Sequence, residues 1–472
     1  MFEEDDDGIF EDAEELKNNI SRFEDALSNK SSFYLDVDQF AELIDYYLDN
    51  DNPVKAMDAI ALASELHPYS SIFILKKAQI YAASNKPMKA LDLLAQMEKM
   101  EPENPDLYFT RANIYSQLRN HVKAIENYKK LIDLADSEEE IEDINLSISF
   151  EYTNHGKYEE AIAHLESILT KNPENESALY EMAYCFEISG KTQNSIEFYN
   201  RFLDNNPFSS IAWFNLGTAY TKLEKYEESI EAFDYAIAIQ DSFASAHFNK
   251  ANSLSALGRY QEAIESYKET FVYEEQDAMA HYYIGECLEK LEEFDKAKAE
   301  YQKAISIDAN LPDPWVGMGV ILDYEGKFME ALHYIKKGVT LDPTNDDYWY
   351  IISEVYRKVG FLDEAIEAFE NIINLDPENE NVWLDYSITY FENENLLKAI
   401  EILNEGIAIQ PQNVKHFAQM AYFLLKKGEK MHAMNFLENA LSMDKNSYKH
   451  LLELAPELND NPEITKIIEN YN

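Results

Sequence analysis

The 472-residue chain has few cysteines and no long apolar run. Its two cysteines, Cys185 and Cys287, are too few and too widely spaced for a disulfide framework or a zinc site. Nowhere do about 18 apolar residues follow one another, so the sequence predicts no membrane-spanning helix. The opening residues, MFEEDDDGIFEDAEEL, lack the basic head and the apolar stretch of a secretory signal. We therefore expect a cytoplasmic protein.

Basic residues are also scarce. The chain has 40 Lys and Arg against 89 Asp and Glu, a net charge of −49. Such a charge repels nucleic-acid phosphates and anionic lipid headgroups, and it attracts basic segments of other proteins. We therefore expect no nucleic-acid partner and no membrane insertion. An alternative role for the charge is to keep the protein soluble and its copies apart.

Sequence motifs of catalysis are missing. The stretch GVILDYEGK, residues 319–327, lacks the spacing and the Ser or Thr of a phosphate-binding loop. The sequence contains neither H-E-x-x-H nor G-x-S-x-G. His247 and His281 take equivalent places in adjacent repeats, where packing is one interpretation and metal binding the alternative. We predict no catalytic, cofactor-binding or metal-binding residues, and hence no enzyme.

A small residue, either Ala or Ser, recurs at a fixed interval along almost the whole chain. The interval is 34 residues, with a single step of 37 residues between Ala124 and Ala161. The series is Ala56, Ala90, Ala124, Ala161, Ser195, Ser229, Ala263, Ala297, Ala331, Ala365, Ala399 and Ala433. A repeat of this length indicates stacked supersecondary units rather than separate globular domains. The longer step falls in the acidic connection ADSEEEIED, residues 135–143.

Each unit is predicted to be a pair of helices. In residues 210–243, one face of the first helix consists of Trp213, Leu216, Gly217 and Tyr220. One face of the second consists of Ser229, Phe233 and Ala236. Six units place glycine between their helices, at Gly156, Gly190, Gly258, Gly326, Gly360 and Gly428. Glycine accepts the left-handed conformation that ends a helix, so these positions predict turns.

These units resemble the tetratricopeptide repeat family, whose pattern has Trp, Leu, Gly and Tyr in a first helix, then Ala and Phe, then Pro. The resemblance is carried by AWFNLGTAY…SIEAF in 212–233, YWYIISEVY…AIEAF…DP in 348–377 and VWLDYSITY…AIEIL…QP in 382–411. It implies an all-α fold, an α-solenoid superhelix of about twelve helical hairpins with terminal capping helices. It also implies a concave inner surface, lined by the first helices, that grips peptides or helices of partner proteins.

The chain divides into three parts. Residues 1–36 are expected to form an acidic, disordered tail and then a capping helix, whose stripe is Leu16, Ile20, Phe23 and Leu27. Residues 37–447 hold the twelve units: 37–70, 71–104, 105–141, 142–175, 176–209, 210–243, 244–277, 278–311, 312–345, 346–379, 380–413 and 414–447. Residues 448–472 are expected to form C-terminal capping helices, because a solenoid must cover its exposed ends.

The candidate partner-binding residues lie just after the Trp position of the first helices, on the face that points away from the packed stripe. Four consecutive units carry an aromatic residue there: Tyr180, Phe214, Phe248 and Tyr282. Beside them are Asn215, Asn249, Asn252 and Tyr283, flanked by Glu181, Glu187, Glu286 and Glu289. Aromatic rings supply rigid apolar contact and asparagine can bond a peptide backbone. The alternative is that the aromatics only stabilise neighbouring helices.

We therefore expect a non-enzymatic scaffold or adaptor that binds a basic or amphipathic protein segment in its groove. One alternative is a structural subunit held in a larger assembly by its outer surface, its ends or the acidic N-terminal tail. Another is an enzyme or the regulatory subunit of one.

Overall fold

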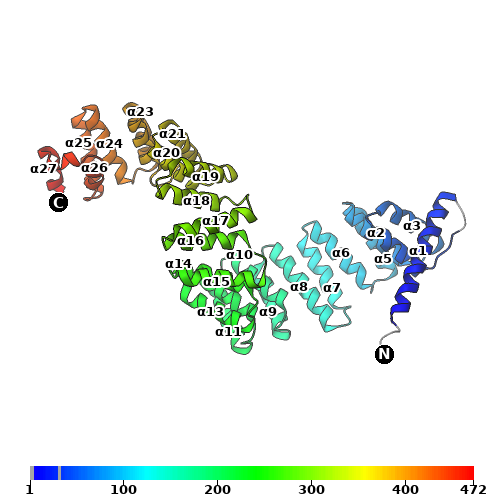
Figure 1. The fold of residues 1–472 in the computed structure, drawn as a ribbon. Coiled ribbons are helices and arrows are strands. Elements are labelled where there is room, and N and C mark those ends of the chain that lie inside the picture. The colour runs from blue at the N-terminus through cyan, green and yellow to red at the C-terminus, as the bar shows by residue number, and fades with distance from the viewer. Residues whose placement is uncertain (1–4, 30–32, 472) are drawn as a thin grey trace. The chain divides into compact units, whose positions relative to one another are not determined.

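The computed structural model describes residues 5–29 and 33–471. This part of the chain contains twenty-seven α-helices, one short 3-10 helix and no strand (Figure 1). The fold is the expected all-α solenoid, in which consecutive helices pack as antiparallel pairs. Among the described residues, none of the helices is both long and apolar enough to cross a bilayer. The chain forms two compact units, residues 1–224 and 225–472.

The first unit contains a long N-terminal helix, five complete hairpins and the first helix of a sixth. Its helices are α1 (Asp5–Asn29), α2 (Val37–Asp49), α3 (Pro53–Leu66), α4 (Ser71–Ala83), α5 (Pro87–Met100), α6 (Pro105–Gln117), α7 (His121–Ile132), α8 (Glu138–Asn154), α9 (Tyr158–Lys171), α10 (Glu176–Ile188), α11 (Thr192–Asn205) and α12 (Ser210–Lys222).

The second unit begins with the second helix of the sixth hairpin and ends with the C-terminal helices. Its helices are α13 (Tyr226–Ile239), α14 (Ala244–Ala256), α15 (Tyr260–Tyr273), α16 (Ala278–Lys290), α17 (Phe294–Ile307), α18 (Asp313–Tyr324), α19 (Phe328–Leu341), α20 (Asp346–Val359), α21 (Leu362–Leu375), α22 (Val382–Glu392), α23 (Leu396–Ile409), α24 (Val414–Lys427), α25 (Lys430–Met443), α26 (Tyr448–Leu454) and α27 (Pro462–Tyr471), with the 3-10 helix η1 (Pro456–Asp460).

The small residues that define the repeat are all in the core. Every member of the series from Ala56 to Ala433 is at most 5% exposed. A second set of small residues lies on the first helices, where Gly319 faces Ile335 so closely that a Cβ would stand 2.3 Å from its Cγ1. Interiors packed at this density leave no room for an added methyl group. Small side chains therefore fix the distance between the two helices of a hairpin.

All twelve turns between paired helices contain one residue in the left-handed conformation. In six of them it is the predicted glycine, with φ between 67° and 88°. In the other six it is a residue with a side chain, at the same place in the repeat: Asp51, Asn85, Arg119, Glu224, Glu292 and Glu394. Glycine therefore marks only half of the turns, and the backbone of the repeat imposes the same conformation on the rest.

The N-terminal segment differs from the expectation of a disordered tail. Helix α1 begins at Asp5 and includes most of the acidic run, whereas the apolar stripe of the expected capping helix begins only at Leu16. Phe2 and the side chains of residues 5–13 lie outside the described part. Further along α1, Phe23 is fully buried and packs with Phe40 and Leu43 of α2. This contact covers the open face of the first hairpin.

The three extra residues of the acidic connection lengthen a helix. Helix α8 begins at Glu138, before residue 142, where the fourth sequence unit starts. The Ser137 side chain accepts a hydrogen bond from the Glu140 amide, and Glu138, Glu139 and Glu140 form the first turn. Carboxylates are favourable at a helix N-terminus, so the acidic stretch starts a helix rather than forming a loop.

The C-terminal helices cover the last hairpin. Helix α26 ends at Leu454, and the 3-10 helix η1 follows from Pro456. Helix α27 then begins at Pro462, where Asn461 Oδ1 accepts hydrogen bonds from the amides of Glu463 and Ile464. Leu451 of α26 and Ile464 of α27 are fully buried in the core cluster of α24 and α25.

Candidate functional site

Five aromatic rings lie together in the second unit, on the first helices α14 and α16 and on the second helices α15 and α17 of two hairpins. Phe248 on α14 lies with its ring centroid 5.4 Å from that of Tyr267 and 5.8 Å from that of Tyr283 on α16. Tyr282 on α16 lies 5.1 Å from Tyr283 and 6.0 Å from Tyr301. Phe248, Tyr282 and Tyr283 are half-buried, while Tyr267 and Tyr301 are buried. Three of the predicted residues thus form one partly exposed cluster.

A hollow of about 250 Å³ opens beside Phe248. Phe248 and Asn249 of α14 line it together with the acidic residues Glu274, Glu275 and Asp277. Asp277 also accepts a hydrogen bond from the amide of Ala280 at the start of α16. The hollow therefore offers an aromatic wall, a half-exposed amide and carboxylates, which suit a cationic or amphipathic side chain.

The predicted asparagines are held by bonds within the protein. Asn249 donates to the Ser245 carbonyl of its own helix at 2.9 Å. Asn252 Oδ1 accepts a hydrogen bond of 2.6 Å from the buried Tyr267 hydroxyl, which joins α14 to α15. Asn252 therefore fixes the ring that supports Phe248, so its role in this cluster is to position an aromatic side chain.

The carboxyls of Glu286, Glu289 and Asp313 lie near this cluster, with Lys290 as the nearby cation. Burial raises the pKa of the Glu286 carboxyl, against a hydrogen bond from Tyr282 that lowers it. Nearby carboxylates of Glu289 and Asp313 raise that pKa further. Burial and the Glu286 charge also raise the pKa of Tyr283. A cation brought to this cluster would favour the ionised form of Glu286.

The other predicted residues belong to the first unit. Tyr180 on α10 is 46% exposed, and Phe214 on α12 is half-buried. Asn215, by contrast, is only 5% exposed, and its amide donates to the Leu179 carbonyl and the Tyr199 hydroxyl, both at 3.1 Å. We expected Asn215 to contact a bound peptide, but it is buried in this structure. Both of its bonds join α12 to the preceding hairpin instead.

Sequence reasoning missed exposed apolar side chains on α8 and α10 of the first unit. Tyr184 and Ile188 on α10 are 49% and 50% exposed, and Phe150 on α8 is 40% exposed. Tyr180, Tyr184 and Ile188 are four residues apart, so they form one stripe along α10. Following the exposed face along each helix, instead of comparing only equivalent positions from unit to unit, would have found them.

The predicted flanking acids differ in their surroundings. Glu187 forms an ion pair of 2.5 Å with Lys222. Glu289 accepts a hydrogen bond of 2.9 Å from the buried Tyr301 hydroxyl. Burial raises the pKa of Glu181. Glu286 and Glu181 are therefore the members whose charge is least compensated.

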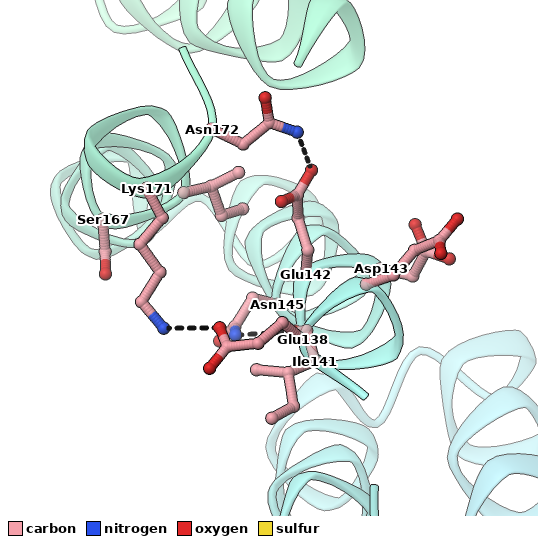
Figure 2. A pocket seen from close by; sticks show the side chains of 10 residues that line it. Glu138, Ile141, Glu142, Asp143, Asn145, Ser167, Lys171 and Asn172 are labelled. Carbon is pink, nitrogen blue, oxygen red and sulfur yellow. Dashed lines mark hydrogen bonds and ion pairs between the residues drawn. The ribbon is translucent and has the colours of Figure 1, made fainter. Parts of the chain in front are cut away.

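A second hollow, of about 470 Å³, lies where α8 and α9 approach (Figure 2). It is rich in acids, but its central carboxylates already have partners. Glu142 accepts hydrogen bonds from the amides of Asn172 at 2.8 Å and Asn175 at 2.5 Å. Lys171 lies 3.5 Å from Glu138. These contacts tie α8 to the end of α9, so the hollow has a structural function.

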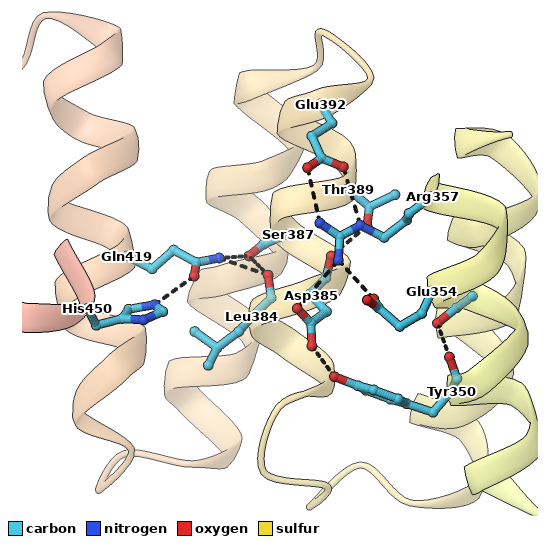
Figure 3. Close-up of polar contacts among 11 residues, drawn as sticks. Tyr350, Glu354, Arg357, Leu384, Asp385, Ser387, Thr389, Glu392, Gln419 and His450 are labelled. Carbon is cyan, nitrogen blue, oxygen red and sulfur yellow. Dashed lines mark hydrogen bonds and ion pairs between the residues drawn. The ribbon is translucent and has the colours of Figure 1, made fainter. Parts of the chain in front are cut away.

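In the second unit, a polar network joins α20 to α22, the first helices of two neighbouring hairpins (Figure 3). Arg357 on α20 bonds Glu354 at 2.9 Å and Glu392 at 3.0 Å, and it lies 3.6 Å from Asp385. Tyr350 donates to Asp385. One guanidinium thus compensates three carboxylates from two hairpins and ties α20 to α22.

The two histidines at the Trp position have partners within the fold. Trp213 Nε1 donates to the Pro207 carbonyl at 2.9 Å, and His247 Nε2 makes the equivalent bond to the Asp241 carbonyl at 3.0 Å. His281 bonds Glu300 at 2.6 Å. Among the described residues, no three His, Cys, Asp or Glu side chains gather as a metal site would require.

Family models agree with this architecture. Models described as tetratricopeptide repeat match residues 75–139, 248–312 and 356–421. A model described as anaphase-promoting complex, cyclosome, subunit 3 matches residues 154–236. With the stacked hairpins, these matches define a repeat scaffold of the kind that binds other proteins. The chain belongs to the tetratricopeptide repeat proteins.

Several solved structures are similar at low identity. One is a chain of the APC/C hetero-tetramer Cut9–Hcn1, with 17% identity and a TM-score of 0.41 over 79% of this chain and 87% of that chain. Another is YrrB, described as a TPR protein with an unusual peptide-binding site, with 21% identity and a TM-score of 0.32 over 39% and 95%. A third is the C-terminal part of a TPR repeat-containing protein from Cytophaga hutchinsonii, with 19% identity and a TM-score of 0.41 over 54% and 98%. No similar protein was found among the curated proteins.

Proposed function

We propose that this protein is a non-enzymatic scaffold that binds a basic or amphipathic segment of a partner protein. The observation that carries the proposal is the hollow beside Phe248, where an aromatic wall faces Glu274, Glu275 and Asp277. Apolar side chains of the segment would pack on Phe248 and Tyr283, and its Lys or Arg side chains would meet the carboxylates.

The carboxyl of Glu286 favours the same partner class. Its pKa is raised by burial, so Glu286 ionises less readily than an exposed carboxyl does. A Lys or Arg side chain beside it would favour the ionised form of Glu286. Binding should therefore weaken as the pH falls through the range in which Glu286 takes up a proton.

The proposal is tested with a synthetic amphipathic helix of Leu and Lys, labelled with a fluorophore and titrated with the full chain. We expect Glu274→Lys with Glu275→Lys to weaken binding about tenfold, since two favourable charge contacts become repulsive. Glu228→Lys with Glu231→Lys makes the same charge change on the exposed face of α13 and should have little effect.

Equal weakening by both pairs would assign the binding to net charge and contradict a defined site. Loss of binding by Phe248→Ala, with the far-ultraviolet circular dichroism unchanged, would support the aromatic wall. Unchanged binding by Phe248→Ala would remove that wall from the proposal.

A second candidate is a structural subunit of a larger assembly, held by its edges. It is favoured by one edge of the first unit, where Phe208 is 83% exposed and lines a hollow of about 520 Å³ with Pro173 and Pro207. Co-purification that depends on Phe208, and not on Phe248, would select this alternative.

A further inference from the structure

Three successive hairpins of the first unit carry the same lysine–tyrosine pair. In each, a lysine in the first turn of the second helix places its ammonium over the ring of a tyrosine near the end of the first helix. The distances to the ring centroid are 5.4 Å for Lys55 and Tyr47, 5.8 Å for Lys89 and Tyr81, and 5.1 Å for Lys123 and Tyr115. Such a contact holds the ammonium close to the protein surface.

The first pair binds a carboxylate. Glu24, on the separate helix α1, forms an ion pair with Lys55 and also accepts a hydrogen bond of 3.2 Å from the Tyr47 hydroxyl. The protein itself thus shows which group this lysine–tyrosine pair takes. The group is the side chain of an acidic residue that arrives on another element.

The second and third pairs have no such carboxylate among the described residues. The ion pairs of this stretch involve Lys76, Arg111, His121 and Lys130, and not Lys89 or Lys123. Both lysines are exposed, and Tyr81 and Tyr115 are half-buried, whereas Tyr47 is buried. A carboxylate from outside the chain can therefore reach both pairs.

An exposed apolar residue precedes each lysine. Val54, Met88 and Val122 are 70%, 66% and 52% exposed. The local charge is also unusual, because residues 76–130 contain ten Lys or Arg and six Asp or Glu within a chain of net charge −49. Apolar and cationic groups thus alternate along the turn edge of these hairpins.

We propose that this edge, formed by Tyr81, Met88, Lys89, Tyr115, Val122 and Lys123, docks an acidic segment of a partner protein. Carboxylates of the segment take the place at Lys89 and Lys123 that Glu24 takes at Lys55. Apolar side chains of the segment cover Met88 and Val122. This surface is separate from the proposed acidic site and calls for a partner of the opposite charge.

Charge decides between an acidic protein segment and other polyanions. Screening limits the reach of a charge to about 8 to 10 Å at physiological ionic strength. A short segment bound at this edge meets mainly the local cations. A nucleic-acid duplex or an anionic membrane extends beyond the edge and meets the acidic remainder of the protein, so both are disfavoured.

The test uses the peptide MFEEDDDGIFEDAEEL, residues 1–16 of this chain, as a probe that combines acids with apolar side chains. It is labelled and titrated with the full chain, and a second peptide has every Asp and Glu replaced by Asn and Gln. We expect the acidic peptide to bind and Lys89→Glu with Lys123→Glu to weaken it at least about tenfold. Lys445→Glu with Lys466→Glu, exposed lysines of the second unit, is the matched control and should leave binding unchanged.

Tyr81→Phe with Tyr115→Phe keeps the rings and removes the hydroxyl donors, so it should weaken binding by a smaller factor. Failure of the acidic peptide to bind, or equal binding by the Lys89→Glu, Lys123→Glu variant, would overturn the proposal. Tighter binding of a DNA duplex or of phosphatidylserine vesicles through the same lysines would also overturn it. A concentration-dependent dimer of the full chain that the lysine variant abolishes would support the surface and identify a second copy as the occupant.

Discussion

The ring of Tyr301 on α17 fills the space that Gly285 on α16 leaves open. A Cβ on Gly285 would stand 2.4 Å from Cε1 of Tyr301, and a Cβ on Gly317 would stand 2.7 Å from its Cζ. Tyr301 is fully buried, and its hydroxyl donates to Glu289. The aromatic cluster of the second unit is therefore fixed from behind by glycines on two first helices.

We predict that Gly285→Ala destabilises the protein by about 1 to 3 kcal/mol, because the added methyl group must displace a ring in a packed core. Urea denaturation followed by circular dichroism measures the change. Lys268→Ala on the exposed face of α15 is the control and should stay within about 0.5 kcal/mol of the parent. A Gly285→Ala variant as stable as the parent would show that α16 and α17 can move apart freely.

The left-handed turns predict a stabilising substitution. Glu394 has φ 58°, a conformation that costs a residue with a side chain about 1 kcal/mol and costs glycine little. We expect Glu394→Gly to raise the free energy of unfolding by roughly 0.5 to 1 kcal/mol. Glu394→Ala removes the side chain beyond Cβ but keeps the Cβ that strains this backbone conformation, so it should not stabilise. If the two variants behave alike, side-chain effects outweigh the backbone at this turn.

Arg357 is expected to stabilise the second unit strongly. Its side chain is 18% exposed and compensates Glu354 and Glu392, with Asp385 close by. Arg357→Met leaves these carboxylates without their cation and should cost about 3 kcal/mol. The next residue, Lys358, pairs with Asp323 at the surface, and Lys358→Met should cost under about 1 kcal/mol. Similar losses in the two variants, measured by thermal denaturation, would refute the special role of Arg357.

His416 predicts a weakening of the C-terminal hairpin in acid. The ring on α24 is fully buried, and neither nitrogen has a hydrogen-bond partner among the described residues. Burial lowers the pKa of His416 from 6.5 to about 4, and the nearby His450 adds to the shift. Because the folded pKa lies below the unfolded one, the unfolded chain binds more protons between these values. The contribution of the neutral His416 ring to stability is therefore fully present at pH 7, and it is lost as the pH drops from about 6.5 to 4.

Amide hydrogen exchange of α24 and α26 at pH 7 and pH 5, corrected for the intrinsic exchange rate, measures this effect. Protection should fall on acidification in the parent, by about 1.4 kcal/mol for each pH unit below the unfolded pKa. His416→Leu should remove that part of the pH dependence. An unchanged dependence in His416→Leu would assign the effect to other titrating groups.

The sequence alone determined the repeat, the all-α class and the interval of the small residues. It did so because helix periodicity, turn glycines and the 34-residue spacing are local patterns that the chain repeats many times. The Trp position could be read in the same way, since Trp213 and His247 occupy one register and make the same hydrogen bond.

Only the tertiary structure decided which polar side chains are available to a partner. Asn215 and Asn249 follow the same pattern in sequence, yet the preceding hairpin buries Asn215 and leaves Asn249 half-exposed. Only the structure showed that Glu24 closes the pair of Lys55 and Tyr47 and that the two following pairs lack a carboxylate among the described residues. The physical reason is that burial and hydrogen bonding are set by neighbouring elements, and these contacts join residues distant in sequence.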